Sequence, residues 1–233
     1  MQNYSGFMGG LYAVAEWIMR FSIVNFLWII INLPILLLTI MMVFAPSTVE
    51  LVALSVPLII LLPLLFYPST IAVYASARDW TMGKDTSSLL RTYWIYMKES
   101  YKKSVWAGIL LTLIWIIWTI DFFYLKDQHS LFGIIMIIIG LALLVFTINY
   151  FCLSVHYFMT NKELFKNAFL ITIGNPLHFF AVLLISASIL YMSFRLWFLF
   201  PFFTVSVISF MTFFSFYRFT LKIEKKAQEF KNR

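Results

Sequence analysis

The stretch LHFFAVLLISASILYMSFRLWFLFPFFTVSVISFMTFFSFY, residues 177–217, carries no charged residue except Arg195 and is too long for one membrane span. A helix needs about 20 apolar residues to cross the hydrocarbon core, because each residue rises only about 1.5 Å. Two helices therefore fit this stretch, with a turn between Arg195 and Pro201. We expect spans over roughly 177–195 and 200–218.

Four more long apolar runs precede this hairpin. The apolar fraction of the chain is 62% and its mean hydropathy is +0.91, values that exclude an ordinary soluble domain. Six spans leave no room for a separate soluble domain, so we expect one integral membrane domain over residues 1–233: an all-α, polytopic bundle of transmembrane helices. The four earlier spans are expected over roughly 21–44, 50–77, 105–124 and 131–158.

The positive charges fall almost entirely on one side of this six-span map. Of the 17 Lys and Arg residues, only Lys126 and Arg195 lie on the other side. Short loops that are rich in Lys and Arg remain in the cytoplasm, so both termini are predicted to be cytoplasmic. A map with five spans would break this segregation of charge. The predicted location is therefore the cell (cytoplasmic) membrane, crossed several times.

The net charge of +7 does not indicate nucleic-acid binding, because the cations are scattered over short loops and the C-terminal tail. They are typical of contacts with the headgroups of the lipid bilayer. The chain contains no Walker lysine motif, Gly-x-Ser-x-Gly, His-Glu-x-x-His or Cys-x-x-Cys. His129 and His178 have no partner at the spacing of metal ligands. We therefore predict no enzyme activity, cofactor or metal, and no catalytic residue.

Polar side chains within the predicted spans are candidates for function. Asn25 and Asn32 are seven residues apart and share a helix face, as do Asn149 and His156. Together they could line an intramembrane cavity, with His156 as the proton-responsive group, or they could form hydrogen bonds between helices. Asp121, an acidic residue near the outer end of the third predicted span, could join this cavity, or it could be a hydrated residue at the interface, within reach of Lys126.

The second predicted span contains Pro57, Pro63 and Pro68. Proline removes a backbone donor and clashes with the preceding turn, so we expect this helix to be kinked or broken. The backbone groups freed by a break could line a substrate site or gate, or the kink could serve packing alone.

Stretches outside the spans are amphipathic, and we expect them to form interfacial helices at 11–20, within 78–104 and at 162–173. The segment 78–104 combines an aromatic apolar face with a basic edge. It could lie on anionic lipid, or it could dock on a cytoplasmic partner, as the coupling helices of transport permeases do. The candidate partner-binding residues are Arg78, Asp79, Trp80, Trp94, Tyr101 and Lys102.

Several motifs resemble the YesL-like family of bacterial membrane proteins. They are Asn25-Phe26-Leu27-Trp28 with Leu33-Pro34, Pro68-Ser69-Thr70 with Ala72, Arg78-Asp79-Trp80 with Gly83, and the aromatic and basic run Trp94 to Lys103. The function of this family is uncharacterised. Its members are similar in often being encoded beside carbohydrate importers of the ATP-binding-cassette (ABC) type in Gram-positive bacteria. The resemblance therefore implies an accessory role in carbohydrate uptake or its regulation.

Two functions remain open from the sequence. The first is a non-catalytic accessory protein that engages subunits of an ABC importer, or a second copy of itself, through segment 78–104. The second is a self-sufficient small-solute transporter or channel, which the broken second span and the paired polar faces would support.

Overall fold

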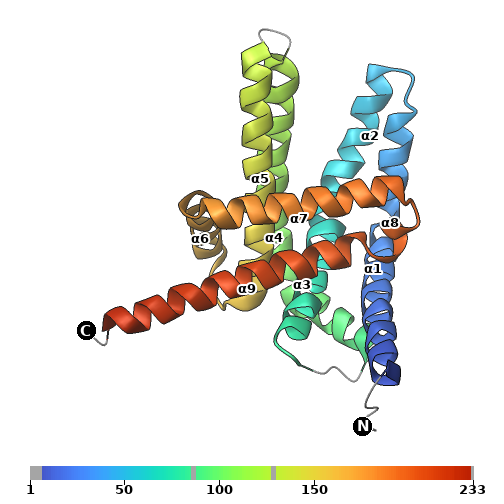
Figure 1. Cartoon of the computed structure of the whole chain (residues 1–233). Helices are drawn as coiled ribbons and strands as arrows, with labels where there is room; N and C mark the ends of the chain where they lie inside the picture. Colours follow the sequence, from blue (N-terminus) through green and yellow to red (C-terminus); the bar gives the residue numbers. More distant parts are fainter. Residues whose placement is uncertain (1–6, 85–87, 127–129, 232–233) are drawn as a thin grey trace.

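A computed structural model describes residues 7–84, 88–126 and 130–231, and within these residues the secondary structure is entirely helical. Six helices are long and apolar enough to cross a membrane, which confirms the all-α fold with six spans. Figure 1 shows the elements, which are α1 (Phe7–Val43), α2 (Thr48–Leu61), the π-helical turn η1 (Leu62–Phe66), α3 (Tyr67–Thr81), α4 (Leu89–Leu125), α5 (Ser130–His156), α6 (Asn161–Gly174), α7 (Pro176–Arg195), α8 (Leu199–Phe202) and α9 (Thr204–Lys231).

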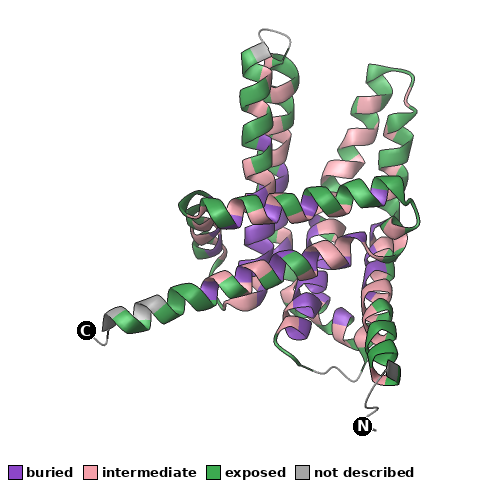
Figure 2. Ribbon diagram, in the orientation of Figure 1, coloured by how far each residue is buried: buried purple, intermediate pink, exposed green. Residues whose placement is uncertain are grey.

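The helices form three hairpins that pack around α3. The α1–α2 and α4–α5 hairpins stand side by side, while α7 and α9 pack against each other and run across them (Figure 1). Buried residues gather where α3, α4, α5 and α9 meet, and the far ends of the two upright hairpins are exposed (Figure 2). In α3 all residues except Arg78 and Thr81 are buried. Its small side chains, such as Ser69, Ala72 and Ala77, allow close approach of its neighbours.

The helix boundaries differ from the predicted ones at the amphipathic stretches. Residues 11–20 and 89–104 are not separate interfacial helices but the first turns of α1 and α4. No proline or glycine separates either stretch from the span that follows, so each helix continues without a break. Ser88 caps α4 by accepting a hydrogen bond from the Arg91 amide. Residues 85–87 of the predicted segment lie outside the described residues.

The stretch 162–173 lies in the separate helix α6, which begins at a capping box. The Thr160 amide and hydroxyl both donate to the Glu163 carboxylate, at 2.8 and 2.9 Å. These hydrogen bonds, the one from the backbone amide above all, lower the pKa of Glu163 below its ordinary value. The last hairpin turns near its expected position, since α7 ends at Arg195, but α9 begins only at Thr204, after the short helix α8.

The second span departs from α-helical geometry beside Pro63, but it is not broken: Thr48–Thr81 is one continuous helical stretch, with Pro57 inside α2. The α-helical pattern changes to a π-turn at Leu62–Phe66, which contains Pro63, and resumes in α3, whose second residue is Pro68. Gly108 of α4 packs against this turn. A Cβ atom added at Gly108 would lie 2.8 Å from Tyr67 Cδ2 and 3.0 Å from Pro63 Cα.

The substitution Gly108→Ala is therefore expected to destabilise the protein by about 1–3 kcal/mol, because the α4 and η1 backbones must separate. Gly10→Ala is the control, since an added Cβ there meets nothing within 4 Å. Thermal unfolding in detergent measures both variants. A Gly108→Ala protein as stable as wild type would contradict the close packing at the π-turn.

Candidate functional site

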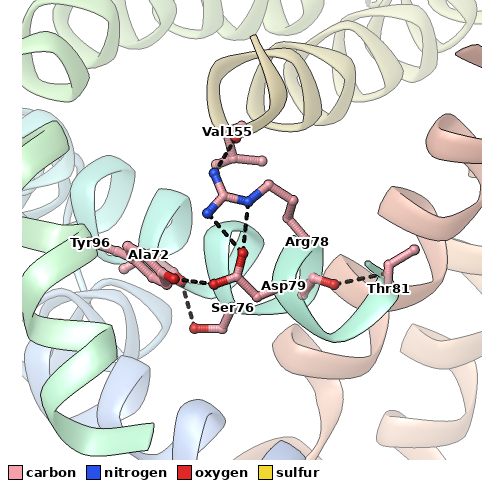
Figure 3. Close-up of polar contacts among 8 residues, drawn as sticks. Ala72, Ser76, Arg78, Asp79, Thr81, Tyr96 and Val155 are labelled. Carbon is pink, nitrogen blue, oxygen red and sulfur yellow. Dashed lines mark hydrogen bonds and ion pairs between the residues drawn. The ribbon is translucent and has the colours of Figure 1, made fainter. Parts of the chain in front are cut away.

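The end of α3 holds an ion pair that joins three helices. Arg78 donates from Nε and Nη2 to Asp79 Oδ1, at 3.0 and 2.8 Å, and from Nη1 to the Val155 carbonyl of α5 at 2.6 Å. The Tyr96 hydroxyl of α4 donates to the other carboxylate oxygen, Asp79 Oδ2 (Figure 3). The Asp79 residue is only 2% exposed. This cluster therefore fixes the positions of α3, α4 and α5 relative to one another.

A cavity of about 360 Å³ adjoins this cluster, between α3, α4 and α5. Its charged and titratable lining includes two cations, Arg78 and Lys103, one carboxylate, Glu99, and His156 beside Tyr96. Lys103 donates to the Met159 carbonyl at 2.6 Å, so it closes the cavity toward the loop after α5. The lining also includes apolar side chains, and the cavity is open to the exterior on one side. With charges of both signs in its wall, it suits a small polar group.

The other side of α4 presents exposed aromatic and basic residues. Trp94 is 45% exposed and Tyr101 is 37% exposed, while Lys102 is also exposed. Leu90, Trp94, Lys98 and Tyr101 follow one another at intervals of four, four and three residues, so they form one row along the helix. We call the exposed residues Leu90, Arg91, Trp94, Lys98, Tyr101 and Lys102 the α4 stripe.

The opposite face of α4 is fixed to the core. Tyr93 and Met97 are buried there, and the Tyr93 hydroxyl donates to the Ser69 carbonyl of α3 at 3.0 Å. The inner face thus anchors the helix, and the α4 stripe remains free to contact other molecules.

The structure divides the six candidate partner-binding residues into two groups. Trp94, Tyr101 and Lys102 lie on the α4 stripe, whereas Asp79 and Trp80 are buried, which corrects their placement on a contact surface. Trp80, 6% exposed, packs edge-on against Trp17 and Phe21 of α1. Arg78 is half-buried and points inward to Val155. A buried carboxylate beside its own cation is a structural anchor in this position.

The five candidate residues for an intramembrane cavity do not come together. Asn25 Oδ1 accepts from the Val205 and Ser206 amides of α9, and its Nδ2 donates to two carbonyls of α8. Asn32 donates to Ser69 Oγ of α3 at 2.8 Å. Both asparagines are fully buried and join neighbouring helices, so of the two alternatives the structure shows hydrogen bonds between helices rather than a common polar cavity.

The remaining three candidates lie apart from these asparagines. Asn149 donates to Thr172 Oγ1 of α6 at 3.0 Å and contacts His178 Nε2 of α7 at 2.9 Å. His156 lines the cavity beside Arg78. Asp121 is exposed near the far end of α4 and does not belong to either network.

Three participating residues were not identified from the sequence: Tyr96, Lys103 and His178. Tyr93, Tyr96 and Lys103 are at helical spacing, which could have indicated an inner face of α4. The residue that each side chain contacts could not have been inferred from this spacing. His178 was considered only as a metal ligand. Within the described residues no group of three or more His, Cys, Asp and Glu side chains could hold a metal ion, and His129 lies outside them.

Comparison with known proteins gives a family of unknown function. Residues 21–122 match the family model described as "Protein of unknown function, DUF624". The chain is 26% identical over 230 residues to the uncharacterized protein YteU of Bacillus subtilis (strain 168), covering 97% of this chain and 92% of YteU. No solved structure matches the chain. These matches confirm the predicted family resemblance over the stretch that contains the Arg78–Asp79 pair and the α4 stripe.

Proposed function

We propose that this chain, which matches the family DUF624 over residues 21–122, is a non-catalytic accessory protein of the cell membrane. In this proposal the α4 stripe binds a subunit of an ABC-type carbohydrate importer. The support is the exposed aromatic and basic stripe on an anchored helix, together with the accessory role in carbohydrate uptake that the family resemblance implies.

The composition of the α4 stripe suits a protein partner. Trp, Tyr and Arg are the residues that contribute most often to binding energy at protein interfaces, and the stripe contains one of each. Its three cations, Arg91, Lys98 and Lys102, complement an acidic surface and speed encounter with one.

The anchoring of α4 also favours binding. Tyr93 and Tyr96 hold the inner face of the helix to α3, and Lys103 holds its next turn to the loop after α5. A surface that is rigid before association loses little conformational entropy when it binds.

Co-purification with importer subunits tests this function. The tagged protein, solubilised mildly from its native membrane, is compared with the double variant Trp94→Ala/Tyr101→Ala. We expect recovery of the permease or ATPase subunits to fall at least about tenfold, as for the loss of two interface residues that each contribute 1 kcal/mol or more.

The chain offers a matched control, Trp106→Ala/Tyr124→Ala. These residues have the same types, lie on the same helix and are exposed, but they lie outside the α4 stripe. The control should insert and recover subunits as wild type does. Equal recovery from both double variants, or recovery of lipid alone with every protein, would count against the proposed docking surface.

A self-sufficient transporter or channel is the alternative function. It would require polar groups that are free to contact a solute. Asn25 and Asn149 are engaged in hydrogen bonds between helices, and Asn32 is engaged through its Nδ2, while its buried Oδ1 has no partner among the described residues. The π-turn, likewise, is packed against Gly108. Solute flux in liposomes that contain the purified protein alone would favour this alternative over the accessory function.

A further inference from the structure

A second cavity, of about 590 Å³, lies between α7 and α9. It is located where α7 begins and the last turns of α9 extend away from the other helices (Figure 1). Its polar lining consists of Asn175, His178, Ser215, Arg218 and Lys222. We propose that this cavity binds a phosphate-bearing anion, either the phosphate of a membrane lipid or that of a soluble phosphate ester. The proposal does not depend on the function of the α4 stripe.

The cavity wall is basic. Arg218 and Lys222 are one helical turn apart, so both side chains lie on the same face of α9, and no carboxylate lines the cavity. Within the described part of the chain neither cation forms an ion pair. The Arg218 guanidinium lies 5.6 Å from the centroid of the Phe214 ring, which holds it at the cavity. Two positive charges therefore remain without a counter-charge from the described residues.

The acidic residue nearest in sequence faces another way. Glu224 lines a separate cavity on the side of α9 that packs toward α5, where its Oε1 accepts from the Tyr157 hydroxyl at 3.4 Å. Glu224 therefore lies toward α5, whereas Arg218 and Lys222 lie toward α7, so Glu224 does not neutralise the two cations that line the cavity.

The floor of the cavity is rigid because His178 is held from several directions. Asn149 Oδ1 can only accept, so His178 Nε2 donates to it at 2.9 Å. His178 Nδ1 forms a second hydrogen bond, with the Ser215 hydroxyl, at 3.3 Å. The ring also stacks on Phe219 with an interplanar angle of 12°. His178 therefore supports the wall, and the cations are the ligands.

The arrangement fits the chemistry of phosphate. A guanidinium donates two parallel hydrogen bonds to phosphate oxygens, and a neighbouring ammonium adds a point charge. The cavity lies beside the N-terminus of α7, where the helix dipole is positive. Exposed apolar side chains, Leu177 and Phe214, border the cations and suit the acyl part of a lipid.

Binding to the purified full-length chain tests the proposal. Two probes are used on protein in an uncharged detergent: phosphatidylglycerol, counted by native mass spectrometry, and glycerol 3-phosphate, titrated by calorimetry. We expect Arg218→Gln/Lys222→Gln to weaken binding of the accepted probe at least about tenfold, since each substitution removes a charge-assisted contact. Retention of phosphatidylglycerol alone assigns the site to a lipid, and binding of glycerol 3-phosphate assigns it to a soluble ester.

The matched control is Lys162→Gln/Lys166→Gln. These two exposed lysines are also one turn apart, lie on α6, next to α7 in the chain, and do not line the cavity. Their substitution removes the same number of charges and should leave binding unchanged. If both double variants lost probe binding equally, the protein would attract anions in general and the proposed site would be wrong. The proposal would also be wrong if neither probe bound the wild-type protein.

A third variant, Ala181→Phe, fills the cavity without a change of charge. It should also lose the probe while its helical content and elution volume remain those of wild type. This variant keeps the test decisive if the loss of both cations disturbs folding.

Discussion

Replacement of Asp79 by Ala is expected to destabilise the protein by about 3–5 kcal/mol, because it leaves the half-buried Arg78 guanidinium without its carboxylate. Tyr96 loses its acceptor at the same time. The ion pair joins α3 to α4 and α5, so the loss should appear as a cooperative fall in unfolding temperature in detergent.

A double-mutant cycle measures the interaction energy between Arg78 and Asp79 apart from the effect of each single substitution. Arg78→Met/Asp79→Ala removes both charges, and we expect it to be more stable than Asp79→Ala alone, since no buried cation then remains unpaired. If the losses of stability in Arg78→Met and Asp79→Ala simply add up in the double variant, the two residues do not interact, and the ion pair does not stabilise the end of α3.

The second large effect is expected at Asn25. Its amide caps two helix ends at once: Oδ1 accepts from Val205 and Ser206 in the first turn of α9, at 2.9 and 3.1 Å, and Nδ2 donates to the Phe200 and Pro201 carbonyls of α8, at 2.9 and 2.8 Å. These backbone groups have no partner within their own helices.

Asn25→Leu has nearly the same volume but satisfies none of these four groups. We expect a loss of about 3–5 kcal/mol, at roughly 1 kcal/mol for each hydrogen bond in a membrane protein. Asn32→Leu is the comparison. Asn32 makes one hydrogen bond to another helix, to Ser69, so this substitution should lower the free energy of unfolding by less. Unfolding in mixed detergent micelles ranks the two, and the reverse order would contradict the role of Asn25 in holding the α8–α9 junction.

The fold could be predicted from the sequence where length and composition constrain it. The 177–217 stretch must turn, and α7 ends at Arg195 because a single span cannot hold the whole run. The three prolines of the second span predicted a kink or break, and the structure has instead a π-turn at Leu62–Phe66, beside Pro63, within a continuous helical stretch. The boundary between residues 104 and 105 was wrong because polarity changes there while the helix does not, so α4 continues.

The candidate site could be predicted from the sequence only in part. Periodicity grouped Trp94 and Tyr101 with Tyr93 and Met97 on one apolar face, whereas the structure exposes the first two and buries the other two. The burial of Asp79 was missed, because an Asp beside an Arg at the end of a span resembles a hydrated loop pair until its contact with Tyr96 is known. The contact between Asn149 and His178 joins different helices and leaves no periodic signal within either.

The most direct test of the central claim is photo-crosslinking from the α4 stripe in the native membrane. A photoreactive phenylalanine analogue is placed at Tyr101 and, in a separate protein, at Tyr124, which is exposed at the other end of α4. We expect position 101 to form an adduct with a permease or ATPase subunit of a carbohydrate importer, and we expect no such adduct at position 124. Adducts at position 101 with lipid alone, or the same products from both positions, would contradict this prediction.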